Sequence, residues 1–160
     1  MSPAYALLTS EAAYRQALDQ VLGQAKHEIL VFDRDLRTLQ LDEKTRLAAL
    51  ADLLQADDSR RIRMVLHDLV PLECHAPRLM QLFARFSHNV SVRQCPGSLR
   101  HLADTHVLID QRHGVRRFHV DQPRSALILD DPTYIEPWWR RFEELWEASL
   151  PNSLLSKPGL

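Results

Sequence analysis

The amino-acid sequence predicts a single α/β domain, and three observations lead to this class. The chain has 160 residues, a length that suits one domain. Its 45% hydrophobic and 26% charged residues are typical of a soluble folded protein rather than a disordered one. Segments with helical apolar spacing alternate with short apolar runs typical of buried strands. We expect the domain to cover residues 1–150, followed by a loosely held tail over residues 151–160.

The first half of the sequence predicts three helix-strand units. Thr9 and Ser10 are good N-caps, and apolar residues then recur at spacings of three and four up to Ala25. The other elements expected are helices over residues 47–54 and 79–86, strands over residues 28–33, 61–68 and 90–94, and a loop between Pro71 and Pro77. Strands separated by helices form parallel crossovers, so we predict a mixed, mostly parallel sheet flanked by helices. The strand ends that would line a ligand crevice carry Asp33, Asp68 and residues 94–96.

The second half predicts a β-hairpin and a closing C-terminal helix. Strands are expected over residues 106–110 and 115–120, joined by a turn over residues 111–114. Gly114 suits such a turn because glycine adopts a positive φ at no steric cost. A further strand over residues 126–129 precedes a helix that begins near Pro137. The apolar residues of this helix recur at helical spacing and should pack against the sheet; they are Trp138, Phe142, Leu145 and Trp146.

The sequence contains no signal for secretion or membrane insertion. The N-terminus lacks a basic segment followed by an apolar run, and no stretch approaches 18 uncharged apolar residues. We therefore expect a cytoplasmic protein without membrane partners, in which Cys74 and Cys95 are reduced. Lys plus Arg number 20 against 21 Asp plus Glu, and this net charge of -1 argues against nucleic-acid binding through bulk electrostatics.

Residues 104–146 resemble the second half of a phospholipase D repeat. The shared features are the segment 104–110, a turn at Gly114, the strand 126–129 and the closing helix with Phe142 and Trp146. In that superfamily the core motif is His-x-Lys-x-x-x-x-Asp on a strand before a hairpin. The order of elements in the first half also fits the superfamily's layout. The resemblance therefore implies a phospholipase-D-like fold for nearly the whole chain.

The catalytic signature of that superfamily is altered in this sequence. If Asp110 occupies the signature aspartate, Ala103 stands at the histidine position and Thr105 at the lysine position. The superfamily's reaction needs a histidine nucleophile and a lysine that binds the phosphoryl oxygens, and neither Ala nor Thr supplies this chemistry. The chain is similar to bacterial phospholipase-D-like proteins that keep the scaffold and lack the signature. The resemblance implies a non-catalytic, degenerate domain without a cofactor, which forms a homodimer as single-repeat members do.

Basic residues in the second half of the sequence suggest a binding role. They are Arg93, Arg100, Arg112, Arg116, Arg117 and Arg124. Arginine suits bidentate contacts to phosphate or carboxylate. Our hypothesis is that an anionic, phosphate-containing ligand or a protein partner binds at the former active-site cleft. The residues expected to contact it are His101, His106, Asp110, Arg116 and Arg117. The competing interpretation is a solvated hairpin with alternating arginines.

The alternative function is an unconventional enzyme built on His101-x-x-Asp104-x-His106. Asp104 and His106 are two residues apart on an expected strand and so share a face, where Asp104 could orient the imidazole in a phosphoesterase. With His101, the pair also has the composition of a zinc or non-haem iron site in a metal-dependent hydrolase. The sequence contains no His-x-Lys pair that would restore the superfamily's own signature.

Overall fold

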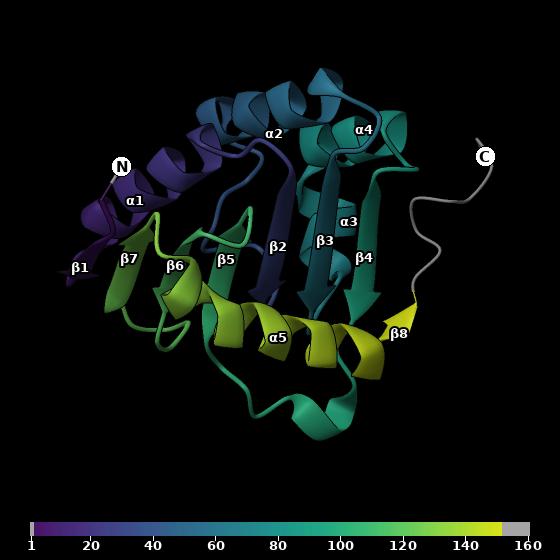
Figure 1. The fold of residues 1–160 in the computed structure, drawn as a ribbon. Helices are drawn as coiled ribbons and strands as arrows, with labels where there is room; N and C mark the ends of the chain where they lie inside the picture. Colours follow the sequence, from purple (N-terminus) through teal and green to yellow (C-terminus); the bar gives the residue numbers. More distant parts are fainter. Residues whose placement is uncertain (1, 152–160) are drawn as a thin grey trace.

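An eight-stranded sheet organises the molecule (Figure 1). The computed structural model describes residues 2–151, and the remainder of the expected C-terminal tail lies outside this part of the chain. The strands are β1 (Ala4–Leu8), β2 (Glu28–Asp33), β3 (Arg61–Leu66), β4 (Val90–Gln94), β5 (Thr105–Ile109), β6 (His113–Arg117), β7 (Ser125–Leu129) and β8 (Leu150–Pro151). Their order across the sheet is β1-β7-β6-β5-β2-β3-β4-β8.

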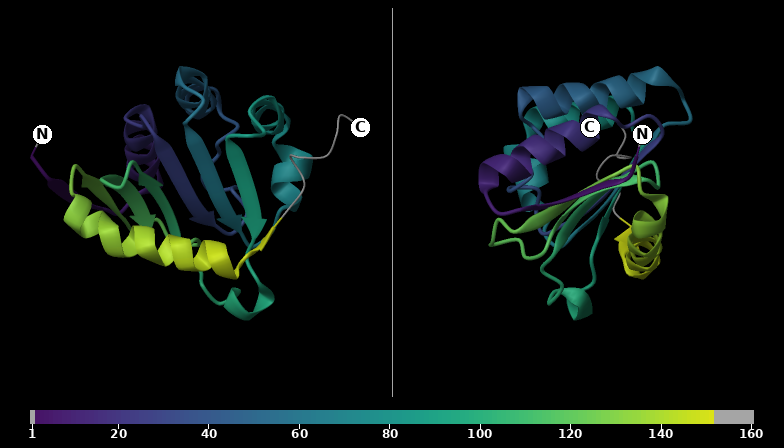
Figure 2. Two further views of the ribbon diagram at one scale, coloured as in Figure 1. Left: turned by 45° about the vertical axis from the view of Figure 1, so that its right-hand side comes forward. Right: turned by 60° about the vertical axis from the view of Figure 1, so that its left-hand side comes forward.

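Helices cover both faces of this sheet. They are α1 (Glu11–Gly23), α2 (Lys44–Ala56), α3 (Val70–His75), α4 (Pro77–Arg85), the 3-10 turn η1 (Gly97–Leu99) and α5 (Pro132–Ala148). α1, α2 and α4 lie on one face, and α5 runs across the strands on the other, as the turned views show (Figure 2). The prediction of an α/β domain with a helix-flanked sheet and a closing helix is confirmed.

The sheet is mixed as predicted, but its parallel part is smaller than expected. Within the described residues, β2–β3 and β3–β4 are the parallel pairs, and the other neighbouring strands are antiparallel. The difference arises at β5. The connection that carries η1 leaves β4 and returns to the sheet at the same end, so β5 must run back along β2 in the opposite direction (Figure 1).

The elements of the first half lie close to their predicted positions. Ser10 is the N-cap of α1, and its hydroxyl accepts a hydrogen bond of 3.0 Å from the backbone N–H of Ala13. The predicted strands over 28–33 and 90–94 are β2 and β4, and β3 ends at Leu66 rather than at residue 68. These segments are predictable because burial on one or both faces imposes a clear apolar pattern.

Alternate residues of each strand face two separate hydrophobic cores. Val31 of β2 belongs to the core beneath α1, α2 and α4, whereas Phe32 belongs to the core beneath α5. The same alternation puts the fully buried Thr105 and His106 of β5 on opposite faces of the sheet. This division decides which of the candidate residues can meet.

The predicted hairpin is present, but its turn lies earlier than expected. Gly114 is inside β6, and the positive φ angles belong to Asp110 and Gln111, at 56° and 60°. Gly114 is needed for space instead of for its φ angle. A Cβ atom there would lie 3.0 Å from both a Leu108 methyl group and the Val107 carbonyl oxygen, so only glycine lets these groups pack.

The C-terminal helix begins five residues before the predicted start. Asp131 caps α5 by accepting a hydrogen bond from the backbone N–H of Tyr134, and Pro132 suits the first helical position. Pro137 therefore lies inside the helix. Phe142 and Trp146 stack with ring centroids 6.0 Å apart beneath the sheet, which confirms the predicted packing face.

Four of the described elements were not predicted from the sequence, namely β1, α3, β8 and the 3-10 turn η1. β1 and β8 are edge strands with mostly exposed residues, so no buried pattern marks them. α3 occupies part of the expected loop after Pro71, where proline in the first turn starts a helix rather than breaking one. Among residues 2–151, no helix is long and apolar enough to cross a membrane.

Candidate functional site

Thr105, at the position that the resemblance gives to the signature lysine, holds a buried carboxyl group. Its hydroxyl donates a hydrogen bond of 2.5 Å to Oδ1 of Asp33, at the end of β2. The second oxygen, Oδ2, accepts a bond of 2.7 Å from the backbone N–H of Leu36. Asp33 is fully buried, and this burial raises the pKa of its carboxyl group. Ala103, at the histidine position, offers only its backbone carbonyl, which accepts from the N–H of Val120 at 2.7 Å.

A half-buried ion pair lies beside Thr105. Arg117 is the partner of Thr105 on β6, and its guanidinium donates to both carboxylate oxygens of Glu11 at 2.9 and 2.6 Å. These bonds lower the pKa of Glu11. The guanidinium also lies 4.8 Å from the ring centre of Tyr14 on α1. Arg117 is only 3% exposed, so it is not free to contact a ligand in this conformation.

His106 lies on the other face of the sheet, beneath α5. The carboxylate of Asp104 lies 3.7 Å from Nδ1 of His106, and two bonds from Arg141 on α5, at 2.8 and 2.9 Å, hold that carboxylate. Burial would raise the pKa of Asp104, but the adjacent His106 and Arg141 hold it well below its usual range. The strand and helix thus bring Asp104 and His106 together as predicted, with Arg141 as a third member.

The imidazole of His106 is enclosed by aromatic rings. Phe32, Phe142 and Trp138 lie with ring centroids 5.4, 6.3 and 6.4 Å from it. Burial lowers the pKa of His106, so the ring is neutral at pH 7. Nδ1 of this ring lies 3.4 Å from a guanidinium nitrogen of Arg141 and 3.7 Å from the Asp104 carboxylate. Nε2 is buried and has no hydrogen-bond partner among residues 2–151.

Arg116 lies on the same face as His106, and its contacts are to aromatic rings and a hydroxyl group. It is the β6 partner of His106, and its guanidinium lies 3.4 Å from the ring centre of Trp138. It donates to the hydroxyl of Tyr134 at 2.8 Å and lies near the Phe118 ring. Within the described part of the chain, none of its contacts is to a carboxylate. Arg116 is half-buried and therefore still reachable from solvent.

Asp110, the signature aspartate of the resemblance, has a structural role at the opposite end of β5. Its carboxylate accepts three backbone hydrogen bonds of 2.8, 2.9 and 2.8 Å, from Lys26, His27 and Glu28. These bonds fasten the hairpin turn to the start of β2. Asp110 is therefore separated by the length of the strand from Thr105, and it does not meet Arg116 or His106.

The remaining predicted site residues are dispersed. His101 is exposed in the connection before β5. Among residues 2–151, no group of three or more His, Cys, Asp or Glu side chains is arranged to hold a metal ion, so the alternative set His101, Asp104 and His106 is not assembled as a metal site. Two of the other arginines have partners of their own, since Arg93 donates to the Trp146 carbonyl and Arg112 pairs with Asp130.

The two cysteines are free, as predicted. Cys74 is exposed on α3, and Cys95 is buried after β4. Burial raises the pKa of the Cys95 thiol, which makes it a poor nucleophile.

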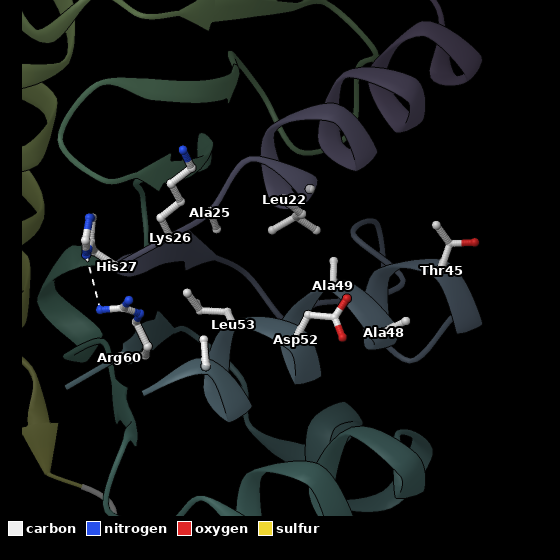
Figure 3. A pocket seen from close by; sticks show the side chains of 12 residues that line it. Leu22, Ala25, Lys26, His27, Thr45, Ala48, Ala49, Asp52, Leu53 and Arg60 are labelled. Atoms are coloured by element: carbon white, nitrogen blue, oxygen red, sulfur yellow. Dashed lines mark hydrogen bonds between the residues drawn. The ribbon is translucent and has the colours of Figure 1, made fainter. Parts of the chain in front are cut away.

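A cavity of about 460 Å³ lies between α1 and α2, at the end of the sheet away from Thr105 (Figure 3). Its walls are largely apolar, including Leu22, Ala49 and Leu53. The basic residues at its rim are Lys26, His27 and Arg60, with Arg60 bonded to His27 at 3.3 Å. No pattern in the sequence pointed to this cavity, because it forms between elements that meet only after folding.

Sequence reasoning also missed Arg141 and the pairing of Thr105 with Asp33. Arg141 lies on the helix face next to the predicted packing residues, and its position one residue before Phe142 was an available signal. The pairing of Thr105 with Asp33 joins residues 72 positions apart, which no local pattern predicts.

Solved structures with a similar arrangement include a phospholipase D family member. Nuc from Salmonella typhimurium, a phospholipase D family member, has 12% identity and a TM-score of 0.66, over 94% of this chain and 99% of its own. NucT from Helicobacter pylori has 10% identity and a TM-score of 0.60, over 94% and 100%. TrmBL2, an archaeal chromatin protein with a novel mode of DNA binding, has 12% identity and a TM-score of 0.67, over 92% of this chain and 54% of its own. At these identities the likeness concerns the fold, which is phospholipase-D-like.

The family follows from the sequence itself. Residues 10–157 match the family described as "Domain of unknown function (DUF7931)", and the chain belongs to it. No curated protein matches the chain significantly.

Proposed function

We propose that this chain is a degenerate phospholipase-D-like domain that does not hydrolyse phosphodiesters and binds an anionic, phosphate-containing ligand. The observation that carries the proposal is the hydrogen bond between Thr105 and the buried Asp33. The superfamily's signature requires a cation at the first of these positions to hold phosphoryl oxygens. Here a hydroxyl group occupies it, and that hydroxyl is committed to a carboxyl group.

The surroundings of Thr105 disfavour a phosphoryl group. Asp33 would repel it when ionised, and the nearest cation, Arg117, is already neutralised by Glu11. Ala103 has no side chain that could form a phosphohistidine. The former catalytic position is therefore better suited to stabilising the fold than to chemistry.

Arg116 is the best-supported ligand contact. Its guanidinium is held over Trp138 and has no carboxylate to neutralise it among residues 2–151. A guanidinium that is already held in place and has no carboxylate partner can donate to phosphate oxygens with little loss of side-chain entropy. In this proposal His106 and Arg141 support the site from beneath, whereas Asp110 and Arg117, each engaged elsewhere, lie outside it.

Two other functions receive less support. TrmBL2 is a chromatin protein that binds DNA, but this chain has a net charge of -1 and several of its arginines are paired within the domain. A phosphoesterase that uses Asp104 and His106 would need an accessible imidazole, and His106 is fully buried with Asp104 bound to Arg141.

A phosphate titration followed by NMR tests the ligand site. Inorganic phosphate should shift the indole N–H signal of Trp138, which lies beneath Arg116. The Arg116→Met variant should lose this shift, while Arg140→Met, at an exposed arginine paired with Glu136, should keep it. Equal phosphate affinity in the wild type and in Arg116→Met would overturn the proposed site.

A further inference from the structure

The cavity between α1 and α2 is elongated and has apolar walls. Leu22 and Leu53, which line it, belong to the main hydrophobic core. The lining residues of α2 run from Thr45 to Ala56, a stretch of helix about 16 Å long. The volume of about 460 Å³ lies within the range of small-molecule sites. These dimensions suit one extended apolar chain.

Short side chains on both walls account for the open space. The residues of α2 that line the cavity recur at spacings of three and four, so they form one face of the helix. Ala48, Ala49 and Ala56 on that face carry only a methyl group. On the α1 side, nothing lies within 4 Å of the position that a Cβ atom would take at Gly23. The two helices therefore leave room between them for a ligand.

Basic residues gather at one end of the cavity. Figure 3 shows Lys26, His27 and Arg60 together at this end and Thr45 at the other. None of the ion pairs formed within residues 2–151 includes Lys26 or Arg60. Nε of Arg60 is buried and has no hydrogen-bond partner within the same residues. This end therefore offers two cations that no carboxylate neutralises.

Asp52 determines the direction in which a charged ligand lies. Its exposed carboxylate is on the α2 wall, one helical turn before Ala56. It repels an anionic group, whereas Arg60 and Lys26 attract one. The anionic group of a ligand must therefore lie at the basic end of the cavity, with the apolar chain along the walls.

We propose that this cavity binds a single-chain amphipathic anion, an aliphatic chain that ends in a carboxylate or phosphate group. The chain lies along the apolar walls, and the anionic group accepts hydrogen bonds from the Arg60 guanidinium and the Lys26 ammonium group. Such charge-assisted bonds are about twice as strong as neutral ones. The cavity is at the opposite end of the sheet from Thr105, so this proposal and the phosphate site at Arg116 can each fail without the other.

Ligands that share one chain and differ in the head group test the site. Octanoate, octyl phosphate, octan-1-ol and octylammonium are titrated into the protein and followed by NMR. Octanoate or octyl phosphate should shift the backbone N–H signals of Gly23 and Ala49, and the tighter of the two identifies the head group. Octan-1-ol and octylammonium should bind at least about tenfold more weakly, because neither carries a negative charge. Equal affinity for all four ligands, or no shift with either anion, would overturn the proposal.

A variant that fills the cavity tests its location. Ala48→Trp places a large side chain in the open space and should abolish the shifts, and Ala48 is exposed, so the fold should tolerate the change. Ala12→Trp, at an exposed position on α1 outside the cavity, is the matched control and should keep them. Octanoate binding that survives in Ala48→Trp as it does in Ala12→Trp would contradict the proposal.

A double variant tests the basic end. Lys26→Gln/Arg60→Gln should weaken octanoate binding about tenfold and leave octan-1-ol binding unchanged, because only the anion uses these cations. Arg15→Gln/Lys44→Gln removes the same total charge from exposed positions outside the cavity and should bind both ligands as the wild type does. If the two double variants bind octanoate equally well, the cations at the rim do not recognise the anion and the proposal is wrong.

Discussion

The hydroxyl of Thr105 and the carboxyl group of Asp33, 72 residues apart in sequence, form a buried hydrogen bond of 2.5 Å across β5 and β2. The resemblance to the phospholipase D signature gives the position of Thr105 to the lysine that binds the substrate phosphate. In this structure the Thr105 side chain satisfies an internal carboxyl group. Substitutions here and at neighbouring contacts, each paired with a matched control, measure how far these contacts stabilise the fold.

Replacing Thr105 with valine should destabilise the fold by about 1–2 kcal/mol, because it keeps the side-chain shape but leaves one oxygen of Asp33 buried without its partner. Urea unfolding monitored by circular dichroism measures the difference. Thr133→Val, at an exposed position in the first turn of α5, should change stability by less than about 0.5 kcal/mol. An equally stable Thr105→Val variant would show that the bond contributes nothing.

Replacing His106 with glutamine should reduce the loss of unfolding free energy that occurs as the pH falls. Burial lowers the pKa of His106 below its ordinary value of 6.5, while Arg116 and Arg141 oppose protonation and Asp104 favours it. Because the pKa of His106 is lower in the folded state than in the unfolded state, the histidine makes its full contribution to the unfolding free energy above about pH 6.5. This contribution is lost as the pH falls below that value.

Unfolding free energies measured between pH 7 and pH 5 test this prediction. The wild type should lose more stability over that interval than His106→Gln does. His88→Gln, at a histidine outside the buried core, should follow the wild-type curve. Parallel curves for the wild type and His106→Gln would mean that the burial of the imidazole does not govern acid sensitivity.

Replacing Glu11 with glutamine should destabilise the fold by about 1–2 kcal/mol, because the buried Arg117 loses its charged partner. The loss should be smaller than for a fully buried pair, since the Glu11 side chain is 42% exposed and partly screened by solvent. Thermal unfolding at pH 7 measures it, with the exposed Glu144→Gln as the control. A Glu11→Gln variant that unfolds together with the control would refute a stabilising role for the pair.

Replacing Gly114 with alanine should destabilise the fold by about 1–3 kcal/mol through overpacking. The added methyl group would lie 3.0 Å from Leu108 and the Val107 carbonyl, and 3.1 Å from Ile135 on α5. Gly23→Ala is the matched control, because nothing lies within 4 Å of a Cβ atom there. Chemical denaturation should separate the two variants, and a Gly114→Ala protein as stable as Gly23→Ala would contradict the packing argument.

The sequence predicts the parts of this fold that have a local, periodic pattern. α1 is marked by Ser10 and its apolar stripe, and β2 by an apolar run buried on both faces. The same criterion does not predict β1. This strand lies at the edge of the sheet and pairs with β7, about 120 residues away, so its side chains are exposed and form no buried pattern. The prediction that Gly114 gives the hairpin turn its positive φ was wrong, because Asp110 and Gln111 adopt this conformation instead. The Asp110 carboxylate holds the turn in place by accepting three backbone hydrogen bonds, which no local pattern indicates.

The candidate site was predictable only in part, for a similar reason. Asp104 and His106 share a strand face, so their proximity follows from the two-residue period. Arg116 and Arg117 are adjacent in sequence and therefore point to opposite faces, where different partners meet them. Arg117 is the arginine that is neutralised, because it meets Glu11, which lies 106 residues earlier in the sequence. This contact forms only when the chain folds, so no local pattern predicts it.

The most direct test of the proposal that the active site is degenerate is hydrolysis of a generic phosphodiester, bis(4-nitrophenyl) phosphate. Purified protein is assayed with and without zinc or manganese, alongside the His106→Ala variant. The resemblance places Ala103 and Thr105 at the signature histidine and lysine positions. With the bond from Thr105 to Asp33, this proposal predicts no turnover above the buffer rate under any of these conditions. Turnover by the wild type that disappears in His106→Ala would contradict this account and identify an unconventional phosphoesterase.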